Sequence, residues 1–227
     1  MAERPIFRPM ETGPHLVESV ATEFAWHAGL SARQKQRSIR SLHESAQKSL
    51  GVDAVLEISS KSESEIGVGL SAFNLTLEVK GVSGSVEVMF QGSKVFSRGG
   101  PFTDLYGMSP REAKRDQRIK ESGPIVGFRF DGEDWPTKPE TVFYDWLYIS
   151  ALLQHGELAS QVLKYDAFSD IEFNPKRSIN CQARSAALYV SLVRRGCLDE
   201  AVSSPAEFIK VCSRSKAVAR GSQEELF

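Results

Sequence analysis

Residues 86–96, with the sequence VEVMFQGSKVF, carry a glutamate, a glutamine and a lysine in a largely apolar segment. Wound as an α-helix, Glu87, Gln91 and Lys94 fall within about 60° of one another, and Phe90 lies beside them. A lysine kept from water tends toward a lowered pKa and becomes a nucleophile, and a nearby carboxyl group can move a proton. The stripe therefore indicates a catalytic site if it lines a cavity, whereas on a surface helix it is an ordinary solvated face.

Residues 168–180, FSDIEFNPKRSIN, lead into a predicted helix that Asn180 can cap. Lys176 and Arg177 precede its N-terminus, where free N–H groups and the helix dipole favour phosphate. Asp170 is either a turn residue or a second catalytic carboxylate. The segment thus predicts a phosphate site with an acidic group beside it, or else a charged, solvated loop.

Two aromatic residues lie in segments that suit recognition of a nucleotide. Residues 67–74, GVGLSAFN, contain small residues that let the backbone approach a ligand, and Phe73 can stack on a base or a sugar. A plain connection between two strands explains the same composition equally well. Trp135, in GEDWPTKP, is either a core or rim aromatic residue or part of a nucleotide pocket.

The elements that must position these residues follow from periodicity and from capping signals. Ser31 with Gln34, and Ser109 with Glu112, have the spacing of capping boxes. Residues 1–30 mix proline, glycine and apolar residues and are expected to be irregular. Helices are expected at 31–50, 86–96, 109–120, 139–154, 181–195 and 204–212, and strands at 53–59, 75–81 and 124–132. The expected fold is α+β and mainly helical, with a few short strands.

The composition is that of an ordinary globular chain and excludes several classes of protein. Of 227 residues, 25% are charged, and the formal net charge of −1 gives no overall sign of nucleic-acid binding, so DNA would need local basic patches such as the expected helices at 31–50 and 109–120. Three cysteines without a CxxC pair and four histidines without ligand spacing predict reduced thiols and no metal site. No apolar run reaches about 18 residues and no signal-like segment occurs, so we expect a cytoplasmic protein without a membrane segment.

In this order, the segments resemble the NADAR superfamily of YbiA-like N-glycosidases and ADP-ribose-processing proteins. The family pattern Glu-x-x-Phe-Gln-Ala-x-Lys-Phe is similar to residues 87–95 of this chain, with Phe96 one position late. Further matches are the 70–73 loop, Trp135, residues 168–170 and Asn180, so that the resemblance covers roughly residues 56–195. This chain replaces a glycine-rich family segment after Asp170 with IEFNPKRS, which suits ADP-ribose or a DNA backbone.

Residues 1–50 resemble the branch of this superfamily that is encoded beside DarT-type DNA ADP-ribosyltransferase toxins. The resemblance implies an antitoxin enzyme that cleaves the N-glycosidic bond between ADP-ribose and guanine in DNA, with no metal and no cofactor. It implies that Lys94 attacks or captures C1 of the ribose, that Glu87 transfers a proton, and that Asp170 positions the sugar or stabilises an oxocarbenium-like transition state. The substrate-binding residues that it implies are Ser71, Phe73, Asn74, Phe90, Gln91, Trp135, Phe168, Lys176, Arg177 and Asn180.

The expected organisation is an N-terminal extension with a basic helix (1–50), a NADAR-like catalytic domain (51–213) and a flexible tail (214–227). The expected partners are ADP-ribosylated DNA as substrate and a cognate ADP-ribosyltransferase toxin. Two alternatives remain at this stage: a small-molecule N-glycosidase that acts on a ribosylated pyrimidine phosphate, and a non-catalytic module that binds ADP-ribose or nucleic acid. The pairing of Glu87 with Lys94 favours catalysis, because a pure binder has no need of a Schiff-base lysine.

Overall fold

The computed structural model describes residues 1–29 and 31–213, so the tail expected over 214–227 lies outside the described residues. The chain begins with a β-hairpin of β1 (Ala2–Pro9) and β2 (Val17–Phe24), which are antiparallel and paired along their whole length. The expectation that residues 1–30 are irregular is therefore wrong. Strand β1 pairs with its other neighbour, β9, only at Phe7, so most of its second side is not paired with a strand, and prolines are tolerated there.

The hairpin belongs to a four-stranded sheet with the strand order β2-β1-β9-β3. Strands β3 (Val55–Glu57) and β9 (Ala167–Ser169) are parallel neighbours, and their register pairs Glu57 with Ser169. Because β9 ends at Ser169, Asp170 follows directly at the carboxyl end of this strand pair. The strand expected at 53–59 is confirmed over its central residues.

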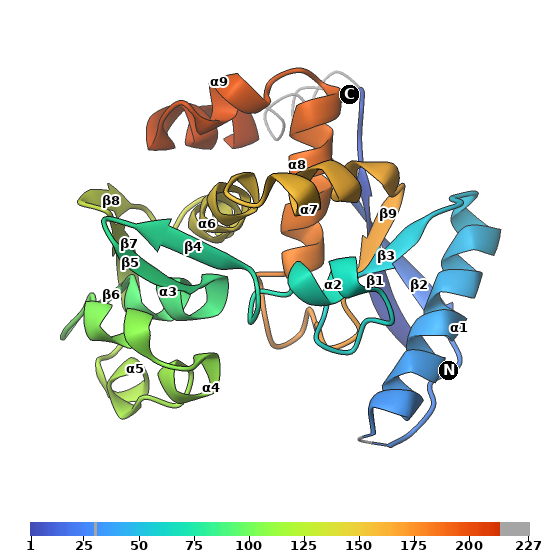
Figure 1. The fold of residues 1–227 in the computed structure, drawn as a ribbon, viewed down its shortest axis with the longest axis horizontal. Helices are drawn as coiled ribbons and strands as arrows, with labels where there is room; N and C mark the ends of the chain where they lie inside the picture. Colours follow the sequence, from blue (N-terminus) through green and yellow to red (C-terminus); the bar gives the residue numbers. More distant parts are fainter. Residues whose placement is uncertain (30, 214–227) are drawn as a thin grey trace, which may run out of the picture.

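Helix α1 (Ala32–Leu50) packs against this sheet (Figure 1). As the sequence predicts, Ser31 caps it, because the Ser31 hydroxyl accepts a hydrogen bond from the Gln34 amide at 3.3 Å. A small core between helix and sheet contains Ile6, Phe24, Ile39, Leu42, Ala46, Val52, Ala167 and Ile171. Residues from the first fifty positions thus share one apolar core with strand β9, and they are positioned by the same packing as the site that follows it.

The larger core surrounds helices α6 (Val142–Leu153) and α8 (Gln182–Arg194), which are apolar around most of their circumference. Figure 1 shows these helices between the four-stranded sheet with α1 on one side and the small sheets with α3 to α5 on the other. The small sheets are the antiparallel pair β4 (Thr76–Val79) and β5 (Val82–Ser85), and the antiparallel set β6 (Lys94–Phe96), β7 (Ile125–Phe130) and β8 (Glu133–Trp135). The expectation of an α+β fold is confirmed.

Helix α3 (Val86–Gly92) is shorter than the helix expected at 86–96. It is buried at every position, and a Cβ atom at Gly92 would lie 2.6 Å from the Tyr106 ring, so close packing requires glycine at its last position. Lys94 then begins β6 and pairs with Phe128 of β7. The expected last turn is wrong because its apolar residues form a sheet, and Lys94 belongs to a strand.

Two other expected boundaries also differ from the structure. The 109–120 helix is divided into α4 and α5, because Asp116 caps a new helix by accepting a hydrogen bond from the Arg118 amide. Helix α8 has Cys181 as its N-cap, so the expected cap at Asn180 is wrong. The remaining elements are α2 (Glu65–Gly69), η1 (Thr103–Gly107), α4 (Pro110–Ala113), α5 (Gln117–Glu121), α7 (Gly156–Gln161), η2 (Val162–Lys164), α9 (Leu198–Val202) and a helical segment at 205–213.

Candidate functional site

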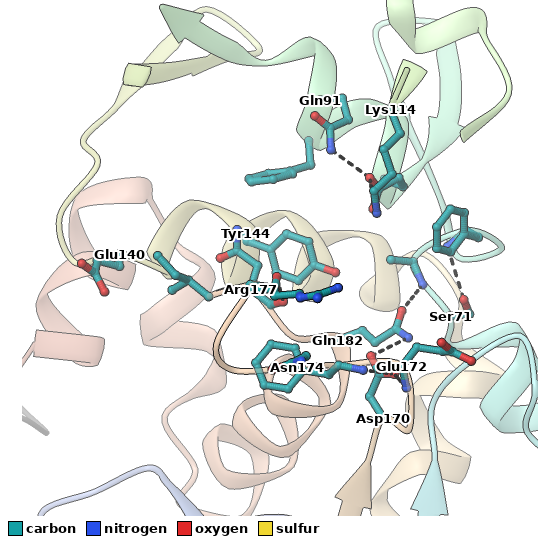
Figure 2. Close-up of a pocket in the computed structure, with 18 of the residues that line it drawn as sticks. Ser71, Gln91, Lys114, Glu140, Tyr144, Asp170, Glu172, Asn174, Arg177 and Gln182 are labelled. Carbon is teal, nitrogen blue, oxygen red and sulfur yellow. Dashed lines mark hydrogen bonds and ion pairs between the residues drawn. The ribbon is translucent and has the colours of Figure 1, made fainter. Parts of the chain in front are cut away.

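A cavity of about 930 Å³ opens between α3, β6, the loop before β4, the segment after β9 and the start of α8. It brings together most of the residues that the sequence marks as a site. Figure 2 shows Gln91 and Lys114 on one wall and Asp170 and Gln182 on the opposite wall. The sequence-predicted residues that line it are Ser71, Phe73, Glu87, Phe90, Gln91, Lys94, Asp170, Arg177 and Asn180.

Four of the residues predicted to bind substrate lie outside the cavity lining. Trp135 is only 3% exposed and packs against Phe143 and Trp146, with ring centroids 5.5 and 5.2 Å apart. Phe168 is fully buried in the four-stranded sheet. The remaining two are exposed loop residues, Asn74, whose amide donates to the Val68 carbonyl, and Lys176.

Gln91 links the two residues of the opening stripe. Its Nε2 donates to Oε1 of Glu87 at 2.8 Å, and its Oε1 accepts a hydrogen bond from Nζ of Lys94 at 2.6 Å. Glu87 and Gln91 lie one turn apart on α3, whereas Lys94 reaches the same point from the first residue of β6. A helix and the strand after it therefore assemble the polar stripe that we expected along one helix.

Lys94 has an environment that favours its neutral form. Its Nζ lies 4.8 Å from the centroid of the Phe90 ring, and burial lowers the pKa of Lys94 to about 8. The negative charge of Glu87 acts against this shift, and the positive charge of Lys114 adds to it. Near pH 7 a lysine with this pKa is mostly protonated, and roughly a tenth of it is the neutral amine, which is the nucleophilic form.

Lys114 is a further cation of the cavity, and the sequence signalled it only as one of several basic residues at 109–120. Its Nζ lies 3.8 Å from Oε1 of Glu87 and 5.6 Å from the centroid of the Phe73 ring. Phe73 is 43% exposed at the cavity wall, so its ring is open to a ligand or a partner. Together they give this wall a positive charge beside an aromatic face.

Asp170 is held on the opposite wall by three donors. Its Oδ1 accepts from the backbone amides of Glu172 and Phe173 at 3.0 and 3.2 Å, and its Oδ2 accepts from Nε2 of Gln182 at 3.0 Å. Gln182 also accepts the Ala72 amide at 2.7 Å and therefore ties this wall to the loop before β4. Burial, and secondly the charge of Glu57, raise the pKa of Asp170 to about 7.

Behind Asp170 lies a row of buried polar side chains that no pattern in the sequence indicates. The Ser169 hydroxyl donates to Oε2 of Glu57, and the Ile171 amide donates to Oε1 of Glu57 at 2.9 Å. Nε2 of His43, on α1, lies 2.8 Å from the Ser169 oxygen. Burial raises the pKa of Glu57 and lowers that of His43 to about 4, so His43 is neutral at physiological pH.

Two more lining residues offer polar groups to a ligand. Tyr144, on α6, packs edge-on against Phe90 at 5.2 Å, and burial raises the pKa of Tyr144 well above its usual value, so its hydroxyl stays protonated. Oδ1 of Asn180 is buried and has no hydrogen-bond partner among the described residues. Because a buried unpaired acceptor costs free energy, a donor on a bound ligand would stabilise this position.

This arrangement combines a lysine of lowered pKa, a carboxyl group that is hydrogen-bonded to the same glutamine, and a second carboxyl group of raised pKa. Such a set can form a covalent imine with an aldehyde carbon, transfer a proton and stabilise positive charge on a sugar. Across residues 1–29 and 31–213 no cluster of three or more histidine, cysteine or acidic side chains is placed to hold a metal ion. In the same residues no helix has the length and apolar character needed to cross a membrane.

The chain matches a known protein family. Residues 2–222 match the model of a family described as DarT1-associated NADAR antitoxin, so the match includes the N-terminal hairpin and α1 as well as the cavity. No curated protein matched the sequence.

Proposed function

Because that match spans almost its entire length, the chain belongs to the DarT1-associated NADAR antitoxins, and we propose that it is a hydrolase that removes ADP-ribose from guanine bases in DNA. The observation that carries this proposal is the meeting of Glu87, Lys94 and Asp170 around one cavity. Its volume of about 930 Å³ lies near the upper end of the usual range for small-molecule sites, which suits a ligand as long as ADP-ribose.

The proposed reaction begins at C1 of the ribose that is joined to guanine. The neutral Nζ of Lys94 attacks C1, the bond between C1 and the guanine nitrogen breaks, and the Glu87 carboxylate takes the proton that Nζ loses and passes it to the departing base. Opening of the ribose ring then gives an imine between C1 and Nζ. Water hydrolyses this imine, which releases ADP-ribose and restores the free amine of Lys94.

The other lining residues support this reaction by position and charge. As a carboxylate, Asp170 stabilises the positive charge that develops on the ribose in an oxocarbenium-like transition state. Gln91 is hydrogen-bonded to both Glu87 and Lys94 and so holds these two side chains close together. Asn180 accepts a hydrogen bond from the ligand. Arg177, which lines the cavity, neutralises a phosphate of the ADP moiety.

The direct test is incubation of the protein with a single-stranded oligonucleotide that carries ADP-ribosylated guanine. We expect unmodified oligonucleotide and free ADP-ribose, both resolved by chromatography. Binding without release would point to a non-catalytic module. Hydrolysis of ribosylated pyrimidine phosphates alone would point to a small-molecule N-glycosidase. A cognate DarT1 toxin would supply the modified DNA in the cell.

A pH dependence follows from the pKa of Asp170, which burial and Glu57 raise to about 7. If the carboxylate is the active form, turnover rises as the pH increases through this value, and deprotonation of Lys94 extends the rise toward pH 8. Glu57→Gln removes one neighbouring negative charge, so the pKa of Asp170 falls and the lower part of the rise moves to more acidic pH. The measurement is kcat/KM between about pH 5.5 and pH 9.

The matched control for this profile is Asp170→Asn, which should lower turnover, weaken substrate binding and lack the lower part of the rise. The Glu57→Gln variant can retain its hydrogen bonds, because the Ser169 hydroxyl and the His43 ring are able to exchange donor and acceptor roles. If kcat/KM rose over the same pH range in Glu57→Gln as in the unchanged protein, Glu57 would not affect the pKa of Asp170.

Salt dependence tests whether basic helices contact the DNA. Each phosphate contact lowers the logarithm of affinity by about 0.7 per tenfold increase in salt for single strands. Arg33 and Arg37 are exposed on α1 and form no ion pair within the described residues, so reversing their charge should weaken binding and flatten the salt slope. Arg118, which pairs with Asp104 and Asp116, is the control and should change binding less.

Affinity is measured by anisotropy of a labelled oligonucleotide at several salt concentrations, with thermal unfolding as the check on folding. An affinity that is equal at low and physiological salt would make the basic helices ordinary solvated faces. The wider set of basic residues for this test, from the two basic segments, is Arg33, Lys35, Arg37, Lys114 and Arg115, with the ion-paired Arg118 kept as the control.

A further inference from the structure

Trp26 is a large exposed aromatic residue that the proposed reaction does not use. It lies between β2 and α1, and its side chain is 37% exposed. The backbone on both sides is fixed to α1, because the Ala25 amide donates to Ser41 Oγ at 3.1 Å and the His27 amide donates to Ser38 Oγ at 2.9 Å. The loop therefore holds an apolar ring at the surface in a defined position, although burial would be more favourable.

Two cations hold the Trp26 ring beside the cavity. Nζ of Lys35 lies 4.8 Å from the ring centroid, and the guanidinium carbon of Arg4 lies 5.6 Å from it. Arg4 lines the cavity, and its Nε donates to the Ile171 carbonyl at 3.3 Å. Nζ of Lys35 forms an ion pair at 3.2 Å with Glu172, which lines the same cavity. The Trp26 ring is therefore linked to the cavity through two side chains. Arg4 lines the cavity itself, and Lys35 is paired with the lining residue Glu172.

The opposite wall repeats this combination of an aromatic ring with a cation. There Nζ of Lys114 lies 5.6 Å from the centroid of Phe73, which is exposed at the cavity wall. Proteins that bind single-stranded nucleic acid combine positive charge along the backbone path with aromatic rings on which bases stack. Bases in a duplex have no free faces for such stacking, so this pattern favours a single strand.

We propose that Trp26, with Arg4 and Lys35, binds a nucleotide of the single DNA strand next to the modified guanine, through stacking on its base and contact with its phosphate. The inference rests on the proposed function, because a base tethered to ADP-ribose in the cavity requires its strand to cross the cavity mouth. The partner has the chemistry of an unpaired nucleobase with a neighbouring phosphate. This contact gives the N-terminal segment, which the family match includes, a role in substrate recognition.

The test compares two substrates, an ADP-ribosylated guanine nucleoside and a single-stranded oligonucleotide with the same modified base in its middle. Trp26→Ala should raise KM for the oligonucleotide by about 5- to 100-fold, since base stacking on an aromatic residue has this effect on affinity. Its kinetics with the nucleoside should stay close to those of the unchanged protein. Trp26→Phe should restore most of the loss, and Val82→Ala, at an exposed apolar residue outside the cavity lining, should affect neither substrate.

Binding of unmodified single-stranded DNA, followed by fluorescence anisotropy, separates this inference from the reaction itself. If the unchanged protein hydrolyses neither substrate but loses DNA affinity on Trp26→Ala, the proposed reaction fails and the stacking surface stands. Equal DNA affinity in the unchanged protein and Trp26→Ala would overturn the inference. An equal loss of activity on nucleoside and oligonucleotide would also overturn it, because that result means a change in the cavity.

Discussion

We expect Lys94→Ala to abolish release of ADP-ribose from modified DNA, and also to abolish an adduct that borohydride should trap during turnover of the unchanged protein. Burial lowers the pKa of Lys94 to about 8, so part of the population carries a neutral amine near neutral pH. This amine forms an imine with C1 of the opened ribose, and borohydride reduces the imine to a stable secondary amine. Mass spectrometry of peptides should therefore place one ADP-ribose on the peptide that contains Lys94.

The controls for this experiment are other lysines of the same chain. Lys80 forms an ion pair with Asp131, and Lys61 does not line the cavity, so Lys61→Ala and Lys80→Ala should retain both turnover and adduct. Lys114 lines the cavity, but its side chain is 60% exposed and lacks the burial of Lys94, so its peptide should carry no adduct. Thermal unfolding shows whether Lys94→Ala remains folded.

Two results would change the assignment of Lys94. If Lys94→Ala still released ADP-ribose at a comparable rate, a covalent imine on this residue would be wrong. Loss of turnover in Lys94→Ala, together with no adduct in the active protein, would leave Lys94 an electrostatic role, in which its charge stabilises the departing group. Lys94→Arg distinguishes these cases, since arginine keeps the positive charge but does not form the imine.

Local signals in the sequence were sufficient for much of the fold. The caps at Ser31 and Ser109 begin helices as expected, because capping depends on residues three positions apart. Gly196 follows α8 with a φ of 64°, as the expected end of that helix requires. The family resemblance was also visible, because its motif of glutamate, glutamine and lysine occupies one short segment.

Features that depend on packing between distant segments were not predictable. The 94–96 run has apolar residues that suit either a helix or a strand, and its pairing with β7, some thirty residues later, decides for the strand. Glu57 lies in the expected 53–59 strand, yet it is buried, and its hydrogen-bond donors are Ser169 of β9 and Ile171, two residues beyond that strand. Trp135 has an ambiguous signal in the sequence, and its ring packs into the core beside α6.

Glu87→Gln should lower turnover by about 10²- to 10⁴-fold with little change in substrate affinity, since this is the usual contribution of a general acid–base group. The amide is nearly isosteric with the carboxylate, and its oxygen can still accept the hydrogen bond from Nε2 of Gln91. The fold of α3 should therefore be intact by thermal unfolding. Glu78→Gln, at an exposed glutamate of β4 outside the cavity lining, is the matched control.

Glu87→Gln should also change the pKa of Lys94, and the direction of that change distinguishes two possible roles of Glu87. The charge of Glu87 raises the pKa of Lys94 against the effect of burial, so removing that charge lowers the pKa of Lys94 further and increases its neutral fraction near neutral pH. If Glu87 acted only through the charge state of Lys94, Glu87→Gln would therefore be as active as the unchanged protein or more active at pH 7. A loss of turnover, with the Lys94 part of the pH profile displaced to lower pH, assigns proton transfer to Glu87. Near-normal turnover would instead reduce Glu87 to a structural partner of Gln91 and Lys94.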